Sequence, residues 1–297
     1  GKAVAARLAF PSRPPNLRPM TQPMILTDRT ALTRHRVRAR SLPDHDEALF
    51  LHRIAMSDLQ ERLSEVNRRF TAPAVVTGFP EVFGELSAAH VVSDDDVIAL
   101  EPNAHDLVVH AMSLHWANDP VGQLVQCRRA LKPDGLCLVV LPGGRSLQEL
   151  RASFAEAETA VTGGLSPRVV PMGEIRDLGA LMQRAGFALP VADSLVQTVE
   201  YRSFPALLSD LRASGETNAL AGRLRHFTRR SVLAEATRIY ASSYSTLEGR
   251  LKATVELVFL TGWAPHESQQ QPLRPGSAKA RLSDALGVPE KPLPKDG

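Results

Sequence analysis

Polar groups that could do chemistry gather in the segment HDLVVHAMSLHWANDP, residues 105 to 120, on and just beyond a short apolar run. A histidine that follows a strand can act as a general base, because its ordinary pKa of about 6.5 is close to neutral pH. His115 and Trp116 are therefore candidates for groups that face a substrate. The structural alternative is that Trp116 packs under the following helix, His115 bonds a loop carbonyl and His110 lies in or near the core.

A second candidate is the loop TGFPEVFGE, which follows an earlier apolar strand at 74–77. Gly78 stands where the first glycine of a nucleotide-type βα turn would stand. Such a turn needs bare backbone so that a cofactor can approach. Here Phe79 and Pro80 occupy the next positions, and the proline also removes an N–H donor. Gly78 and Phe79 are the candidate contacts of a degraded cofactor cradle.

Four further residues are candidates for the same cleft. Asp94 and Asp96, in the run Ser-Asp-Asp-Asp, could hold ribose hydroxyls, although consecutive acids are also typical of a solvated turn. Ala111 and Met112 end the strand at 105–111. Their backbone could line the adenine side of a cofactor, or they could simply pack in the core.

Other kinds of site find little support in the sequence. His266 and Glu267 could join His115 in a 2-His-1-carboxylate iron triad, but nothing in their spacing selects them, so no metal site is predicted. The two cysteines, Cys127 and Cys137, follow neither metal-ligand nor CxxC spacing. No apolar run approaches the roughly 18 residues that a transmembrane helix needs, so no transmembrane segment is expected.

Charge is distributed unevenly along the chain. The formal net charge is +3, and residues 1–40 hold nine Lys and Arg against a single acid, Asp28. The remainder is therefore acidic overall and shows no basic stripe of the kind that binds phosphate backbones. We do not expect a nucleic-acid partner.

The elements that must position these residues alternate between strands and helices. A long amphipathic helix is expected over 46–70, ahead of the strand at 74–77. The strand 105–111, a helix over 121–131, a Lys-Pro-Asp-Gly turn and the apolar run 136–141 form a βαβ unit, which requires a parallel sheet. Further elements are expected as helices over 145–161, 172–187, 204–215 and 229–244 and as strands over 195–204 and 251–263.

The spacing of the first strands indicates a deletion. About thirty residues separate Val75 from Asp106, whereas two intervening βα units take about sixty. We therefore predict a doubly wound, mainly parallel α/β sheet that is shortened by one βα unit and ends in an antiparallel hairpin.

This pattern resembles the class I S-adenosylmethionine-dependent methyltransferase fold, a Rossmann-like architecture, over residues 45 to 265. Several motifs are similar to one branch, the methyltransferase-like assembly factors of respiratory complex I in mitochondria and alphaproteobacteria. They are DLVVHAMSLHWANDP, ALKPDG, GGRSLQELR, GGLSPRVVP, DLGALMQRAGF and GWAPHESQQQPLRPGSAKA.

The resemblance implies a cofactor cleft for S-adenosylmethionine and a protein substrate, a complex I subunit. Two alternatives remain open. The protein could be a catalytically silent scaffold that has lost cofactor binding, or a protein-arginine hydroxylase. It would act in the bacterial cytoplasm or, alternatively, the mitochondrial matrix.

The same reasoning divides the chain into three parts. Residues 1–44 are expected to be a basic, largely disordered lead-in, with a natural start near Met20 or Met24. Residues 45–265 form the methyltransferase-like domain, with a helical insert at about 203–246. Residues 266–297 are expected to be an irregular tail.

Overall fold

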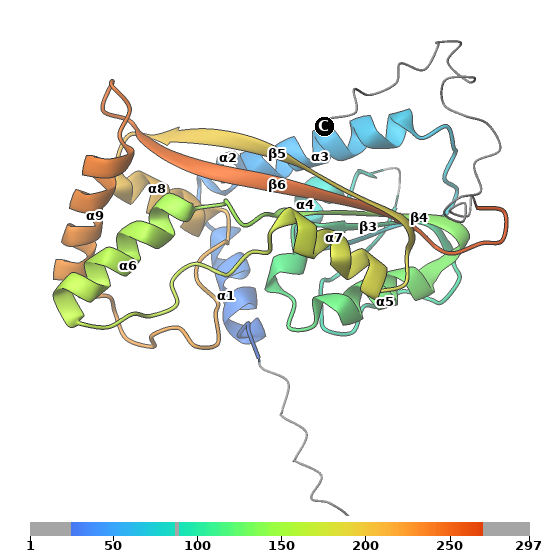
Figure 1. Cartoon of the computed structure of the whole chain (residues 1–297), viewed down its shortest axis with the longest axis horizontal. Coiled ribbons are helices and arrows are strands. Elements are labelled where there is room, and N and C mark those ends of the chain that lie inside the picture. Colours follow the sequence, from blue (N-terminus) through green and yellow to red (C-terminus); the bar gives the residue numbers. More distant parts are fainter. Residues whose placement is uncertain (1–24, 87–88, 270–297) are drawn as a thin grey trace, which may run out of the picture.

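The computed structural model describes residues 25–86 and 89–269. Their strands form one six-stranded sheet in the order β2-β1-β3-β4-β6-β5 (Figure 1). β1 to β4 run parallel, whereas β6 is antiparallel to β4 and to β5. The strands are β1 (Pro73–Thr77), β2 (His90–Val92), β3 (His105–Ala111), β4 (Leu131–Pro142), β5 (Ala188–Tyr201) and β6 (Leu251–Trp263).

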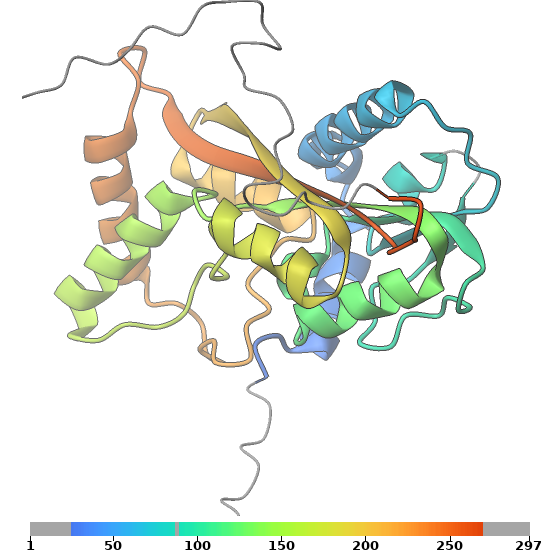
Figure 2. The same ribbon diagram turned by 45° about the vertical axis from the view of Figure 1, so that its right-hand side comes forward.

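Helices cover both faces of the sheet, and a group of three stands beside it (Figure 2). α5 and α7 pack on one face and α3 on the other, while α6, α8 and α9 gather at one end of the long β5–β6 hairpin. The helices are α1 (Arg29–Ala39), α2 (His45–Ala48), α3 (Phe50–Glu65), α4 (Pro80–Phe83), α5 (Pro120–Ala130), α6 (Gln148–Thr162), α7 (Ile175–Arg184), α8 (Phe204–Ala213) and α9 (Arg230–Tyr244). A short 3-10 turn, η2 (Leu114–Trp116), follows β3.

Local signals explain the central βαβ unit. β3 is buried almost throughout, as expected for a strand covered on both faces. Pro120 opens α5, and the Asp119 carboxylate accepts a hydrogen bond from the Gly122 amide as the N-cap. The expected turn at Lys-Pro-Asp-Gly lies within the bounds of β4, where Asp134 has a φ of 60° and the pairing with β3 shifts register.

The predicted fold class is confirmed. The sheet is doubly wound and mainly parallel, and it ends in an antiparallel hairpin whose connection carries α8 and α9. Among the described residues, β2 is the only strand between β1 and β3, and it contains three residues. The sheet is therefore short on this side by one βα unit, as the spacing predicted.

The expectation of a disordered lead-in over 1–44 is wrong for its second half. Residues 29–39 form α1, which begins where the Asp28 carboxylate accepts a hydrogen bond from the Ala31 amide. Leu32 and Ala39 are buried against the rest of the fold. Charge composition alone suggested disorder, but Arg29 and Arg36 of this helix have acidic partners elsewhere in the chain. The proposed starts at Met20 and Met24 lie outside the described residues.

Three further expectations concern the C-terminal tail, transmembrane segments and the division of the chain into parts. Residues 266–269 are irregular, and the rest of the tail predicted for 266–297 lies outside the described residues. Among the helices of the described ranges, none is long and apolar enough to cross a membrane. The three-part division of the chain itself remains a prediction.

Candidate functional site

The carboxyl ends of the parallel strands bring the predicted cofactor residues to one edge of the sheet. β1 ends before Gly78, β2 before Asp94, and β3 at Ala111 and Met112. The Gly78 amide donates to the Ser113 hydroxyl at 2.9 Å, which ties the loop after β1 to the end of β3. Ligands of open α/β sheets bind at this edge, so it is the candidate cleft.

The space between Gly78 and Asp94 holds a guanidinium group from α1. Arg36 Nη1 lies 2.8 Å from Asp94 Oδ1, and both side chains are over nine-tenths buried. The guanidinium presses on the Gly78 backbone so closely that a Cβ there would lie 2.1 Å from Nη1. Arg36 also lies 4.9 Å from the centre of the Phe79 ring. The bare backbone of Gly78 therefore accommodates an arginine of the same chain.

The acids of the Ser-Asp-Asp-Asp run have different surroundings. Asp96 is exposed, as a solvated turn predicts, but Asp94 is only 3% exposed. Burial alone would raise the pKa of Asp94, yet the guanidinium groups of Arg36 and Arg29 hold it below its ordinary value. Asp94 was expected to face ribose hydroxyls or solvent, and instead it is the centre of a buried ion-pair cluster.

Phe79 fills the position that follows Gly78. Its side chain is 1% exposed and packs in the core between β1 and α3, with its ring centre 4.0 Å from that of His52. Ala111 is fully buried, and Met112, with a φ of 49°, is 4% exposed. In this arrangement the residues do not fit S-adenosylmethionine, because Arg36 holds the candidate ribose acid and covers the glycine that would admit the methionine end.

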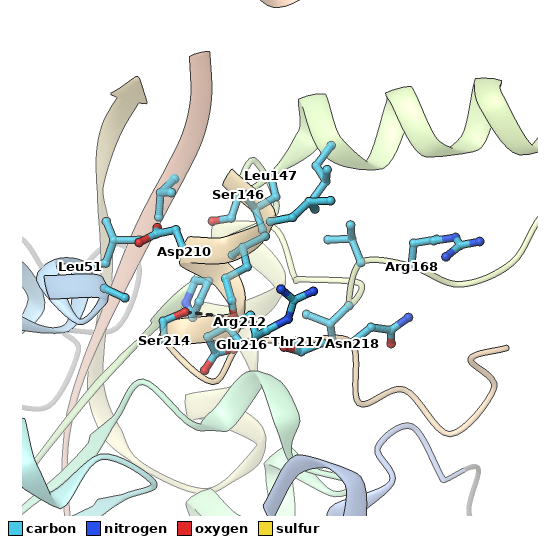
Figure 3. Close-up of a pocket in the computed structure, with 18 of the residues that line it drawn as sticks. Leu51, Ser146, Leu147, Arg168, Asp210, Arg212, Ser214, Glu216, Thr217 and Asn218 are labelled. Carbon is cyan, nitrogen blue, oxygen red and sulfur yellow. Dashed lines mark hydrogen bonds between the residues drawn. The ribbon is translucent and has the colours of Figure 1, made fainter. Parts of the chain in front are cut away.

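The structure also contains an open pocket, which Met112 helps to line (Figure 3). Its volume is about 450 Å³, and its walls come from α3, the ends of β3 and β4, the start of α6 and the segment after α8. Most of the lining is apolar. The apolar lining includes Leu51, Met112, Trp116, Leu147, Leu150, Phe154, Val170 and Leu208.

Glu216 supplies a negative charge to this pocket. Its Oε2 accepts hydrogen bonds from Trp116 Nε1 at 2.7 Å and from His115 Nε2 at 3.1 Å. Its Oε1 is buried and has no hydrogen-bond partner among the described residues. Burial alone would raise the pKa of Glu216, but the charge and hydrogen bond of His115, together with Arg36, lower it to about 2. The carboxylate is therefore ionised at neutral pH.

His115 and Trp116 both contact the Glu216 carboxylate, which neither the substrate-facing nor the structural interpretation predicted. Trp116 is buried, and His115 bonds a carboxylate from a distant segment rather than a loop carbonyl. His110 lies in the core, as expected, with Nε2 2.9 Å from Gln123 Oε1. The strand-end motif therefore holds Glu216 in place, and only Trp116 of its two candidates lines the pocket.

His52 is a pocket residue that the sequence did not indicate. It is 2% exposed on α3, and neither ring nitrogen has a hydrogen-bond partner among the described residues. Burial lowers its pKa to about 4, so its ring is neutral at pH 7. A histidine inside an amphipathic helix gives no local signal of this role. Among the described residues, no group of three His, Cys, Asp or Glu side chains is placed to hold a metal ion.

Comparison with known proteins agrees with the methyltransferase-like fold. Residues 47–139 match the family model of a methyltransferase domain. The mitochondrial arginine-hydroxylase NDUFAF5 of Homo sapiens is 38% identical over 200 residues, which cover 67% of this chain and 58% of that protein. Residues 47–139 carry a methyltransferase domain. The resemblance seen in the sequence is thereby confirmed, because the chain is similar to the NDUFAF5 proteins.

Two other proteins are similar to this chain. The malonyl-acyl-carrier-protein O-methyltransferase of Laribacter hongkongensis is 33% identical over 63% of this chain and 61% of its own length. The YcgJ protein from Bacillus subtilis superimposes with a TM-score of 0.47 at 9% identity, over 71% of this chain and 99% of that one. The chain spans 45 to 62% of the length of the NDUFAF5 relatives that it matches.

The matched methyltransferase domain includes β1 to β3 and most of β4, but not every group of the site. Arg36 precedes residue 47, and Glu216 follows residue 139. The two charges that distinguish this site, the guanidinium in the cleft and the carboxylate in the pocket, therefore come from segments on either side of the matched residues.

Proposed function

We propose that this protein acts in the assembly of respiratory complex I by taking an arginine side chain of a partner subunit into the pocket beside Met112. The observation that carries the proposal is the Glu216 carboxylate. It is ionised and partly buried, its Oε1 has no partner in the part of the chain that the structure describes, and it lies in a largely apolar pocket. A guanidinium group with an aliphatic stem matches both properties of such a pocket.

The names of the relatives support this choice of side chain, because those that are 35 to 38% identical are arginine-hydroxylases. Those relatives are mitochondrial, and we propose the bacterial cytoplasm or the mitochondrial matrix as the compartment of this chain. A methyltransferase domain would imply S-adenosylmethionine. Our proposal does not require it, because Arg36 fills the cleft in which the cofactor was expected.

Two cations also line the pocket and bear on the proposal. Arg168 forms an ion pair with Glu158, and Figure 3 shows it at a distance from Glu216. Arg212 is exposed and has no ion-pair partner among the described residues. An incoming guanidinium would therefore meet one uncompensated positive charge. Removing the Arg212 charge should strengthen the binding of a cation and weaken the binding of an anion.

The test is a titration of the purified protein with arginine amide, and with citrulline amide as an uncharged analogue of similar shape. We expect arginine amide to bind, citrulline amide to bind at least about tenfold more weakly, and Glu216→Gln to remove the difference. Arg212→Ala should bind arginine amide as well as or better than the natural protein. Equal affinity for the two amides, or weaker binding by Arg212→Ala, would contradict the proposal.

The second measurement is the intact mass of complex I subunits from cells with and without this protein. An added oxygen on an arginine would assign hydroxylation, and an added methyl group would assign methylation. Unchanged masses together with impaired assembly would assign a scaffold that binds arginine without modifying it. Normal assembly and unchanged masses in cells without the protein would reject a role in complex I assembly.

A further inference from the structure

We propose that Arg36 has replaced the cofactor: its guanidinium is the resident group of the cleft between Gly78 and Asp94, and it excludes S-adenosylmethionine from this protein. The inference goes beyond the proposed function, which concerns the pocket that Glu216 and Met112 line. It assigns a specificity-determining role to a helix outside the residues that match the methyltransferase family.

Three neighbours hold the guanidinium group in the cleft, and its buried Nε and Nη2 have no hydrogen-bond partner among the described residues. Asp94 binds it as a charged acceptor at 2.8 Å, and the ring of Phe79 faces it at 4.9 Å. A Cβ at Gly78 would lie 2.1 Å from Nη1 and 2.2 Å from Cζ. A carboxylate, an aromatic face and a glycine backbone therefore surround the group on three sides. Phe79, which occupies one of the tight positions of the loop, gains a role as the ring beneath a cation.

Arg29 of α1 and its C-cap residue Arg40 also hold the helix over this cleft. Arg29 donates to the Asp94 backbone carbonyl at 2.6 Å and lies 3.3 Å from Asp94 Oδ2. Arg40 donates to the Gly78 carbonyl at 2.9 Å and lies 3.2 Å from Glu81. Residues 29, 36 and 40 share one face of an α-helix. This face holds the ends of β1 and β2 together.

The aliphatic stem of Arg36 also has a neighbour, in the segment after α8. Gly215 has a φ of 84°, and a Cβ there would lie 3.3 Å from Arg36 Cγ, so the segment after α8 packs directly on the stem of the arginine. Arg36 is thus enclosed between the sheet edge and this segment. A cofactor could enter only by breaking a buried ion pair, which we expect to weaken its binding by about a hundredfold or more.

The experiment is isothermal titration of the full chain with S-adenosylhomocysteine, in the natural protein, in Arg36→Ala and in Arg34→Ala. Arg34 is an exposed arginine of the same helix and serves as the matched control. We expect no binding to the natural protein or to Arg34→Ala at millimolar ligand. Arg36→Ala should bind at least about tenfold more tightly than that limit, because the guanidinium no longer fills the cleft.

Two results would overturn the proposal: micromolar binding by the natural protein, or no binding by folded Arg36→Ala. Circular dichroism establishes whether the variant is folded. If Arg36→Ala does not fold, Arg36→Gln retains a hydrogen-bond donor toward Asp94 and takes its place in the titration. The same two results apply to it.

A second readout needs no ligand. Gly78→Ala introduces the Cβ that would collide with the guanidinium, so it should lower the melting temperature in the natural background and much less in the Arg36→Ala background. Equal losses in both backgrounds would show that Gly78 and Arg36 do not press on each other and would also reject the proposal. Neither readout depends on arginine amide binding, so this inference and the proposed function can fail separately.

Discussion

Glu216 accepts hydrogen bonds from two side chains that are adjacent in the sequence and a hundred residues away from it. Trp116 Nε1 can only donate, and its donor is satisfied here by a carboxylate oxygen. His115 reaches the same oxygen through Nε2. This one acid therefore fixes the end of β3 against the segment after α8, in addition to charging the pocket.

We predict that Glu216→Ala lowers the free energy of unfolding by about 2 to 3 kcal/mol, because it leaves two largely buried donors without an acceptor. Glu216→Gln should lose less, since an amide oxygen can still accept from Trp116. Urea denaturation measures both. The control is Glu65→Ala, which removes an exposed acid near the end of α3 and should change stability by less than about 0.5 kcal/mol. Equal stability of the Glu216→Ala and Glu65→Ala variants would show that this hydrogen-bonded cluster contributes nothing.

The sequence predicts which of these residues share one edge of the sheet, but it does not predict their contacts. Gly78, Asp94 and Met112 follow three strands that apolar runs define, so their place at one sheet edge could be predicted. Their contacts could not. The partner of Asp94 is 58 residues away and the partner of Trp116 is 100 residues away. No local pattern records such a pairing, since an exposed and a buried charge look alike in a sequence.

At the scale of the elements, local sequence patterns explain some helices and strands, whereas contacts with distant residues explain others. β3, α5 and β4 have apolar runs bounded by Asp-Pro and Pro-Asp-Gly, and they form where expected. α1 has a polar, arginine-rich sequence that is typical of a disordered segment. It is ordered because Leu32 and Ala39 are buried and because distant carboxylates and carbonyls accept from its arginines.

The start of α1 provides a test of this explanation. Asp28 caps the helix through the Ala31 amide and also pairs with Arg223 and Arg225; the cap is the larger cause, and together they lower the pKa of Asp28 to about 2. We predict that Asp28→Ala makes α1 open more often, with several-fold faster cleavage by trypsin after Arg34 and Arg38. Asp28→Asn retains a capping acceptor and should fall between Asp28→Ala and the natural protein. Identical digestion of all three would mean that the cap does not hold α1.

On the scale of the whole molecule, the pocket lies where the sheet, α3 and the helices α6 and α8 meet. His52 and Glu216 line it, and Arg36, Asp94 and His110 are further buried ionisable groups near the carboxyl ends of the parallel strands. Arg36, Asp94 and Glu216 are charged there, whereas His52 and His110 are kept neutral by burial, which lowers the pKa of both. Stability should therefore depend on pH through groups that also form the site.

We predict that stability falls steadily as pH decreases from 7 to 3. Burial lowers the pKa of His52 from 6.5 to about 4. Between these pH values the histidine is protonated in the unfolded chain but neutral in the fold, so stability is lost as pH falls from 6.5 to 4. This histidine alone accounts for about 3 kcal/mol. Below about pH 4.5 protonation of carboxylates also lowers stability, because the pKa of Glu216 is near 2 in the fold.

Thermal melts across this range measure how steeply stability changes with pH. His52→Leu should flatten it between pH 6.5 and 4, whereas replacing the exposed His226 by alanine should not. An unchanged slope in His52→Leu would show that His52 is not held neutral by the fold.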